Sequence, residues 1–193
     1  MKRLFCAVKI AADDTIRETI GHFQQSLADE RIKWVNPEIL HLTLHFFGDT
    51  HSGSEEKIIQ ALRDAARRVE PFCIDVSGCG SFGPKRAPRV VWLGIRNAES
   101  LVQLHSKVQK RLQPLGLDTG KQPYVPHLTI GRIKGPVNQD VFVHLLKKYS
   151  DKHFSRQQIE SMVLYQSILH KDGPEYRPVE IFTLQARNDE KSS

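Results

Sequence analysis

Two short motifs with the pattern His-x-Thr-x, where x is apolar, occur in this chain of 193 residues. The first is His41-Leu42-Thr43-Leu44 and the second is His127-Leu128-Thr129-Ile130. Because alternate side chains of a β-strand share a face, each motif predicts one imidazole beside one hydroxyl, with the two apolar residues facing the core. One such tetrapeptide carries little weight, but two with the same pattern indicate a site that contains two histidines and two threonines.

The two histidines, His41 and His127, suit acid–base chemistry at phosphorus. The unperturbed pKa of histidine is about 6.5, so a neutral imidazole can accept a proton while a protonated one donates. In-line displacement at phosphorus needs these groups on opposite sides of the phosphate, which strands from two lobes could provide. Thr43 and Thr129 could donate hydrogen bonds to non-bridging phosphate oxygens. The four residues therefore predict a metal-free site, although their types do not decide which histidine is the acid.

The elements that would position these motifs follow from hydrophobic spacing and from Gly and Pro positions. Helices are predicted over residues 13–30, with Asp13 or Asp14 as N-cap, and over 54–69, 98–112 and 138–149. Strands are predicted over residues 4–10, 40–48, 72–76, 89–95, 124–133, 158–169 and 179–186, with a loop over 78–88 and a turn around 172–174. This order, without regular βαβ alternation, indicates an α+β fold with two similar halves. No Ser/Gly linker divides them, so we expect one bilobal domain over 1–187 and a frayed tail over 188–193.

Composition restricts the class of protein. The chain has 28 Lys and Arg against 22 Asp and Glu, a formal net charge of +6 that suits a polyanionic partner such as RNA. Its cysteines, Cys6, Cys73 and Cys79, have no zinc-ligand or disulfide spacing. The first apolar stretch is cut by Lys9 and is too short for a secretion signal or a membrane span. We expect a cytoplasmic protein that acts as a monomer without membrane contact.

Further stretches beside the two motifs point to a known family. They are Trp34-Val35-Asn36-Pro37, Phe46-Phe47-Gly48, Arg89–Gly94, Pro126–Arg132, Leu164–Ser167, Gly173-Pro174 and Tyr176. Together with the motifs, they resemble the 2H phosphoesterase superfamily, most closely the branch described as RNA 2′,3′-cyclic phosphodiesterase or 2′-5′ RNA ligase. The resemblance covers nearly the whole chain outside the tail. It implies two lobes, each with an antiparallel sheet and flanking helices, around a central cleft that contains both motifs.

The same resemblance implies roles for individual residues. It makes His41 the proton donor to the departing ribose 3′ oxygen and His127 the proton acceptor that activates water, giving a 2′-phosphate without a cofactor. It also implies that Arg132 binds phosphate, a geometry that guanidinium fits well. Strict alternation places Arg132 on the face opposite His127, unless Gly131 supplies a bulge or ends the strand. Without either, Arg132 would reach the site from its rim or would be an ordinary surface arginine.

Other residues are weaker candidates. By alternation His45 and Phe47 share the face of His41, and Phe47 could stack on a base, as could Tyr124. Core packing is an equally good interpretation of Phe47, and an aromatic residue at the start of a strand, such as Tyr124, more often has a packing role. The basic run that comprises Lys85, Arg86 and Arg89 could contact phosphates or could belong to a solvated loop.

Three alternatives remain open at this stage. The same acid–base pair could act on a 2′-5′ linkage, as a 2′-5′ RNA ligase or a 2′-5′ phosphodiesterase. The chain could instead be a non-catalytic module that binds RNA in the cleft. A zinc protein that uses His41, His45 and His127 would lack a fourth ligand nearby. The sequence does not determine whether the natural substrate is an RNA with a 2′,3′-cyclic phosphate end or a related small nucleotide, nor which base is preferred.

Overall fold

The computed structural model describes residues 1–117, 123–171 and 173–185. Its helices are α1 (Asp14–Ser26), α2 (Ser52–Ala66), α3 (Glu99–Leu112) and α4 (Gln139–Lys148), with short 3₁₀ helices at Pro37–Ile39 and Gln113–Leu115. Its strands are β1 (Lys2–Lys9), β2 (Ile32–Trp34), β3 (His41–Thr50), β4 (Phe72–Phe82), β5 (Val90–Arg96), β6 (His127–Ile133), β7 (His153–Ile159), β8 (Ser161–His170) and β9 (Gly173–Thr183). Within the described residues, no helix is long and apolar enough to cross a membrane.

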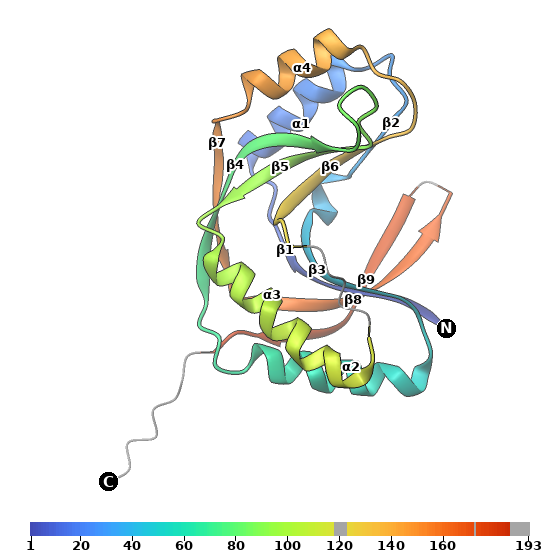
Figure 1. Ribbon diagram of the computed structural model, residues 1–193, viewed down its shortest axis with the longest axis vertical. Helices are drawn as coiled ribbons and strands as arrows, with labels where there is room; N and C mark the ends of the chain where they lie inside the picture. The colour runs from blue at the N-terminus through green and yellow to red at the C-terminus, as the bar shows by residue number, and fades with distance from the viewer. Residues whose placement is uncertain (118–122, 172, 186–193) are drawn as a thin grey trace.

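The strands form two antiparallel sheets. One has the order β3-β1-β8-β9 and the other has the order β2-β6-β5-β4-β7. Helices α1 and α4 lie at one end of the molecule beyond the five-stranded sheet, and α2 and α3 flank the four-stranded sheet at the other end (Figure 1). The α+β fold with two antiparallel sheets and flanking helices is therefore confirmed. The lobes are not successive halves of the chain, because β2 belongs to the second sheet while β8 and β9 return to the first.

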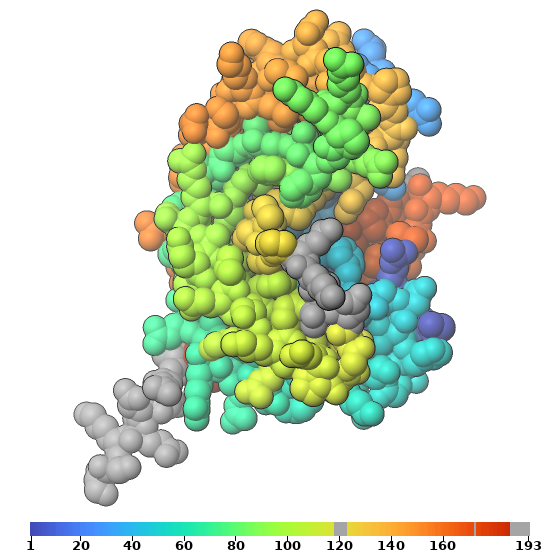
Figure 2. Space-filling model, in the orientation of Figure 1, coloured from blue at the N-terminus to red at the C-terminus, as the bar shows by residue number. Residues whose placement is uncertain are grey.

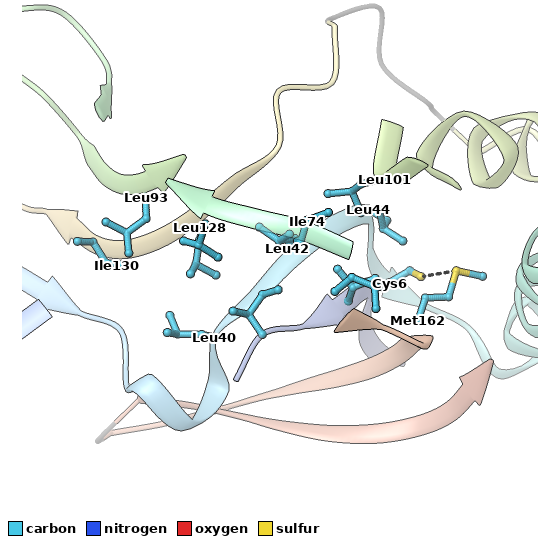
Figure 3. Packing of buried hydrophobic residues seen from close by; sticks show 14 of the residues in the cluster. Cys6, Leu40, Leu42, Leu44, Ile74, Leu93, Leu101, Leu128, Ile130 and Met162 are labelled. Atoms are coloured by element: carbon cyan, nitrogen blue, oxygen red, sulfur yellow. Dashed lines mark hydrogen bonds between the residues drawn. The ribbon is translucent and has the colours of Figure 1, made fainter. Parts of the chain in front are cut away.

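A continuous hydrophobic core holds the two motif strands in place. Leu42 and Leu44 of β3 and Leu128 and Ile130 of β6 are all buried and belong to one cluster. Figure 3 shows these side chains together with Leu93, Leu101 and Met162, which come from other elements. Burying a Leu or Ile side chain contributes about 1.5–3 kcal/mol, so the apolar positions of the two motifs supply a rigid support for the polar ones.

Several predicted boundaries are correct and others are wrong. Asp13 caps α1, since its carboxylate accepts a hydrogen bond of 2.9 Å from the backbone of Ile16. The loop predicted over 78–88 is wrong in its first part, because β4 continues to Phe82. Strand β7 was not predicted, and β9 begins earlier than the predicted strand over 179–186. The predicted tail over 188–193 and the first residue of the predicted 172–174 turn lie outside the described residues.

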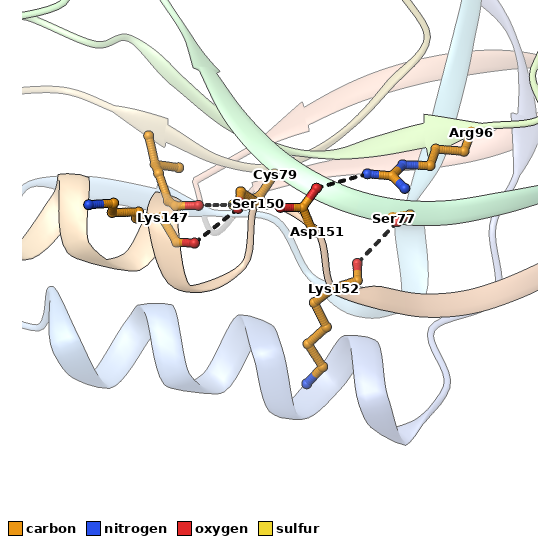
Figure 4. Close-up of polar contacts among 8 residues, drawn as sticks. Ser77, Cys79, Arg96, Lys147, Ser150, Asp151 and Lys152 are labelled. Carbon is orange, nitrogen blue, oxygen red and sulfur yellow. Dashed lines mark hydrogen bonds and ion pairs between the residues drawn. The ribbon is translucent and has the colours of Figure 1, made fainter.

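A bulge in β4 contains Gly78, at the start of the segment that the sequence predicted to be a loop. The register with β5 is irregular between Val76 and Cys79, where Gly78 has a φ of 74°. The turn after α4 occupies this bulge, since the backbone N–H of Gly78 and the hydroxyl of Ser77 both donate to the Lys152 carbonyl (Figure 4 draws the Ser77 bond). A Cβ at position 78 would lie 2.6 Å from the carbonyl oxygen of Ser150, so only glycine fits. The glycine therefore marks a contact between elements inside a strand.

Candidate active site

A pocket of about 860 Å³ lies between the two sheets and is lined by both motif strands. Strand β3 contributes His41 and Thr43, and β6 contributes His127, Thr129 and Arg132. In Figure 2 the surface is hollowed between the two lobes, on the side where the β8–β9 hairpin is visible. The structure thus brings together the five residues that the sequence singled out for proton transfer and phosphate binding.

A β-bulge follows the threonine of the second motif. The register of β6 with β5 jumps from Gly131 to Thr129, which leaves Ile130 as the extra residue. A bulge reverses the alternation of side chains beyond it. Arg132 consequently lies on the face of His127 and Thr129, and its guanidinium joins the pocket. The bulge that brings Arg132 to this face is therefore present, one residue before the glycine.

The first motif has the same bulge at the equivalent position. The register of β3 with β1 jumps from His45 to Thr43, so that Leu44 is the extra residue. Beyond this bulge, the side chain of Phe46 lies on the same face of the sheet as His41, just as Arg132 lies on the same face as His127. The two motif strands therefore present the same pattern to the cleft: histidine, threonine, and then the residue five positions after the histidine.

The prediction that His45 and Phe47 share the face of His41 is wrong, because the bulge was not foreseen. His45 is only 8% exposed, and its Nδ1 lies 3.2 Å from Nε2 of Gln109 on α3. Phe47 packs partly buried against the hydrophobic core, beside the His45 ring. Phe46, which is 59% exposed, lines the pocket in place of Phe47, and the buried His45 also contributes to the lining, at the α3 end.

The same backbone hydrogen bond orients both motif histidines. Nδ1 of His41 lies 2.8 Å from the carbonyl oxygen of Ile39, and Nδ1 of His127 lies 2.8 Å from that of Val125. Since a carbonyl oxygen only accepts, each Nδ1 must carry a proton. Each Nε2 is then left to accept a proton when the ring is neutral, or to donate one when the ring is protonated.

The surroundings of His41 disfavour its charged form. Its ring centroid lies 5.0 Å from that of Phe5 and 5.2 Å from that of Tyr176. This burial lowers the pKa of His41, the hydrogen bond to the backbone opposes the change, and the positive charges of Arg132 and His127 lower the pKa further. The positive charges of β6 therefore act on His41 across the cleft.

The ring of His127 is also enclosed by aromatic side chains. Its centroid lies 4.7 Å from that of Phe82, in an edge-on arrangement, and 6.5 Å from that of Trp92. Trp92 can lie across β4 because residue 80 is glycine, where a Cβ would come within 2.4 Å of the indole. The packing of both catalytic candidates between rings restricts their rotation and favours one geometry.

Similarity to known proteins agrees with this geometry. A model of the 2′-5′ RNA ligase superfamily matches residues 12–165. The chain belongs to this superfamily. An RNA 2′,3′-cyclic phosphodiesterase of Methanothermobacter thermautotrophicus is 37% identical over 184 residues, which cover 94% of this chain and 98% of that protein. A protein of the same name from Archaeoglobus fulgidus is 35% identical over 181 residues, which cover 93% and 99%.

Solved structures of similar proteins share the fold of this superfamily member. The protein TT0787 of Thermus thermophilus superposes with a TM-score of 0.78 at 25% identity, covering 96% of this chain and 99% of that one. LigT of E. coli, solved in complex with 3′-AMP, superposes with a TM-score of 0.72 at 25% identity, covering 95% and 98%. The resemblance to the 2H phosphoesterases seen in the sequence is thereby confirmed.

In this superfamily member, the pocket continues past β3 to α3. Tyr124, a predicted base-stacking residue, lines the pocket, and its ring stacks on that of His105 at 3.9 Å and 5°. Nε2 of Gln109 lies 3.1 Å from Nε2 of His105. One face of Tyr124 is therefore covered by α3, and a base could stack only on the other face.

Some pocket residues were not predicted as site residues. Phe46 could have been found from the five-residue offset that relates Arg132 to the second histidine. Lys33 had no local signal, because it reaches the pocket only through the pairing of β2 with β6, where it lies beside Arg132. Tyr176 belongs to a stretch that resembles the superfamily, but its contact with the His41 ring depends on the return of β9 to the first sheet.

The zinc alternative lacks a ligand set in this fold. Among the residues that the structure describes, no three His, Cys, Asp or Glu side chains are close enough together to hold a metal ion. The bulge at Leu44 turns the His45 side chain toward α3, where its Nδ1 lies 3.2 Å from Nε2 of Gln109. Among the described residues, His41, His45 and His127 thus do not form a set of zinc ligands.

Proposed function

We propose that this protein hydrolyses RNA ends that carry a 2′,3′-cyclic phosphate, leaving a 2′-phosphate. The observation that carries the proposal is the convergence of His41 and His127 from two sheets on one pocket, each with its Nε2 available. Relatives that are 37% and 35% identical over nearly their whole length have the name RNA 2′,3′-cyclic phosphodiesterase, which supports the same activity here.

In the proposed reaction, His127 and His41 act on opposite sides of the phosphate. Nε2 of His127 accepts a proton from water while the water oxygen forms a bond to phosphorus. The bond between phosphorus and the ribose 3′ oxygen breaks, and Nε2–H of His41 donates its proton to that oxygen. The product retains phosphate on the 2′ oxygen. A proton must then pass from His127 to His41 before the next turnover.

Other pocket residues would stabilise charge and hold the terminal nucleotide. Thr43 and Thr129 lie beside the two histidines, where their hydroxyls would donate hydrogen bonds to the non-bridging oxygens. Arg132, with Lys33 next to it, would neutralise the phosphate. The exposed ring of Phe46, in place of Phe47, would stack on the base. No residue in this scheme needs a cofactor.

The description of the superfamily favours a second candidate activity on the 2′-5′ linkage. A ribose hydroxyl would take the place of water, and the same two histidines would transfer protons in either direction. The geometry suits both reactions. A comparison of the reaction rate with water and the reaction rate with an RNA hydroxyl would distinguish hydrolysis from ligation.

The test is hydrolysis of an RNA oligonucleotide that ends in a 2′,3′-cyclic phosphate by EDTA-treated protein. We expect conversion to the 2′-phosphate, with losses of about 10²–10⁴-fold in both His41→Ala and His127→Ala. His144→Ala is the matched control, because this exposed histidine of α4 lies outside the pocket. Turnover that needs an added metal ion, or full activity in either motif variant, contradicts the proposal.

A further inference from the structure

A second groove adjoins the candidate active site at Arg132. This groove, which we call the basic groove, has a volume of about 570 Å³ and is lined by Ala87, Pro88, Arg89, Val90, Arg132, Ile133, Lys134 and Gly135. It shares Val90 and Arg132 with the active-site pocket, so the two hollows have a common wall. Its charged side chains, Arg89, Arg132 and Lys134, are all basic and exposed.

Backbone hydrogen bonds join the two segments that carry these cations and tie a third segment, which carries Arg31, to them. The backbone N–H of Ile133 donates to the carbonyl of Arg89 at 2.9 Å, which ties the start of β5 to the end of β6. The N–H of Lys134 donates to the carbonyl of Arg31 at 2.7 Å, which adds the segment before β2. The positive charges at this end of the sheet are therefore fixed by the fold.

Several further basic residues lie close to the basic groove. Seven basic residues lie in it or next to it: Arg31, Lys33, Lys85, Arg86, Arg89, Arg132 and Lys134. Within the described residues, none of the seven is in an ion pair, whereas Arg17, Arg63 and Arg96 elsewhere each bind a carboxylate.

The loop between β4 and β5 extends this surface. It spans residues 83–89, contains Lys85 and Arg86, and projects from the lobe of the five-stranded sheet (Figures 1 and 2). Both side chains are exposed. Exposed, unpaired cations beside a groove bind phosphate groups without regard to base sequence.

We propose that the basic groove binds the phosphodiester backbone of single-stranded RNA on the 5′ side of the terminal cyclic phosphate. The inference rests on the proposed function. A terminal nucleotide held at the two histidines is joined through its 5′ phosphate to the rest of the RNA strand. That strand must leave the pocket along one of its walls. Arg132 and Val90 form a wall that leads directly to Arg89 and Lys134. The natural substrate is then an oligonucleotide end, and a cyclic mononucleotide is a poorer one.

The test compares two substrates that share the reacting group: 2′,3′-cyclic CMP, and a five-nucleotide RNA that ends in cytidine 2′,3′-cyclic phosphate. In Arg89→Ala/Lys134→Ala, we expect kcat/KM for the RNA to fall about tenfold at low salt, while kcat/KM for cyclic CMP stays within about twofold. The slope of log kcat/KM against log salt concentration for the RNA should become shallower by about 1.4, or about 0.7 for each lost phosphate contact.

The matched control is Lys110→Ala/Arg111→Ala, which removes one lysine and one arginine from the exposed end of α3 in the other lobe. We expect this control to leave both substrates unchanged. An equal loss on both substrates, or the same loss in the control, overturns the proposed groove. If the intact protein hydrolyses cyclic CMP but Arg89→Ala/Lys134→Ala hydrolyses the RNA at the wild-type rate, the proposed function stands and only this inference is overturned. If the intact protein hydrolyses neither substrate, the proposed function fails and the inference fails with it.

Discussion

Gly131→Ala is expected to disturb the bulge that places Arg132 in the pocket. A Cβ at this position would lie 2.9 Å from Cε3 of Trp34 and 3.0 Å from Cγ1 of Val91, and both neighbours are held in strands. Overpacking of this kind costs about 1–3 kcal/mol. For a chain of this size, about 2–4 °C of melting temperature is lost per kcal/mol, so we expect a decrease of about 2–12 °C.

The effect of Gly131→Ala on activity should exceed its effect on folding. A displacement of about 1 Å of a group that binds the reacting phosphate costs about 10²-fold, and we expect that loss in kcat/KM well below the melting temperature. Gly53→Ala is the control, because a Cβ at this position of α2 would meet nothing within 4 Å. Thermal melting and cyclic-phosphate hydrolysis are measured on both variants. Wild-type stability and activity in Gly131→Ala would refute the reasoning from the bulge.

Two further predictions concern His41 and Phe46. Because burial lowers the pKa of His41 and a general acid must start protonated, kcat/KM should fall as the pH rises through a value below 6.5. Arg132→Gln removes a positive charge and should shift that limb to higher pH, and an unmoved limb in the pH–rate profile contradicts the electrostatic argument. Phe46→Ala should raise KM for RNA by about 5- to 150-fold, the equivalent of about 1–3 kcal/mol of stacking, with little change in melting temperature. Phe47→Ala should show the reverse, a lower melting temperature with KM retained; equal effects of the two variants on KM would exclude this division of roles.

Local signals predicted the parts of the fold that depend on nearby residues. The two motif strands, the helical spacing of α3 and the cap at Asp13 are all set within a few residues along the chain. Five residues of the pocket followed from the motifs and from the family resemblance: His41, Thr43, His127, Thr129 and Arg132. Such features depend on alternation, helical periodicity and capping, which a sequence displays directly.

Features that depend on a distant partner strand were not predictable in the same way. The bulge at Leu44 exists only relative to β1, so alternation assigned Phe47 to the cleft where Phe46 lies. Strand β7, at the edge of its sheet, has the polar sequence Ser155-Arg-Gln-Gln158 in its middle and owes its conformation to pairing with β4. Gly78 favours a turn by its local preference, yet the structure uses it for a bulge inside a strand. In each case the deciding contact comes from a residue remote in sequence.

The central claim is that His41 acts as the general acid and His127 as the general base. A substrate whose leaving group needs no proton tests this claim directly. In a 2′,3′-cyclic phosphate with sulfur in place of the 3′ oxygen, the departing thiolate is stable without an acid. His41→Ala, inactive on the normal cyclic phosphate, should hydrolyse this sulfur-containing substrate at close to the wild-type rate, and His127→Ala should remain inactive on both. Rescue of His127→Ala instead would reverse the two roles, and failure to rescue either variant would contradict general acid catalysis by this pair.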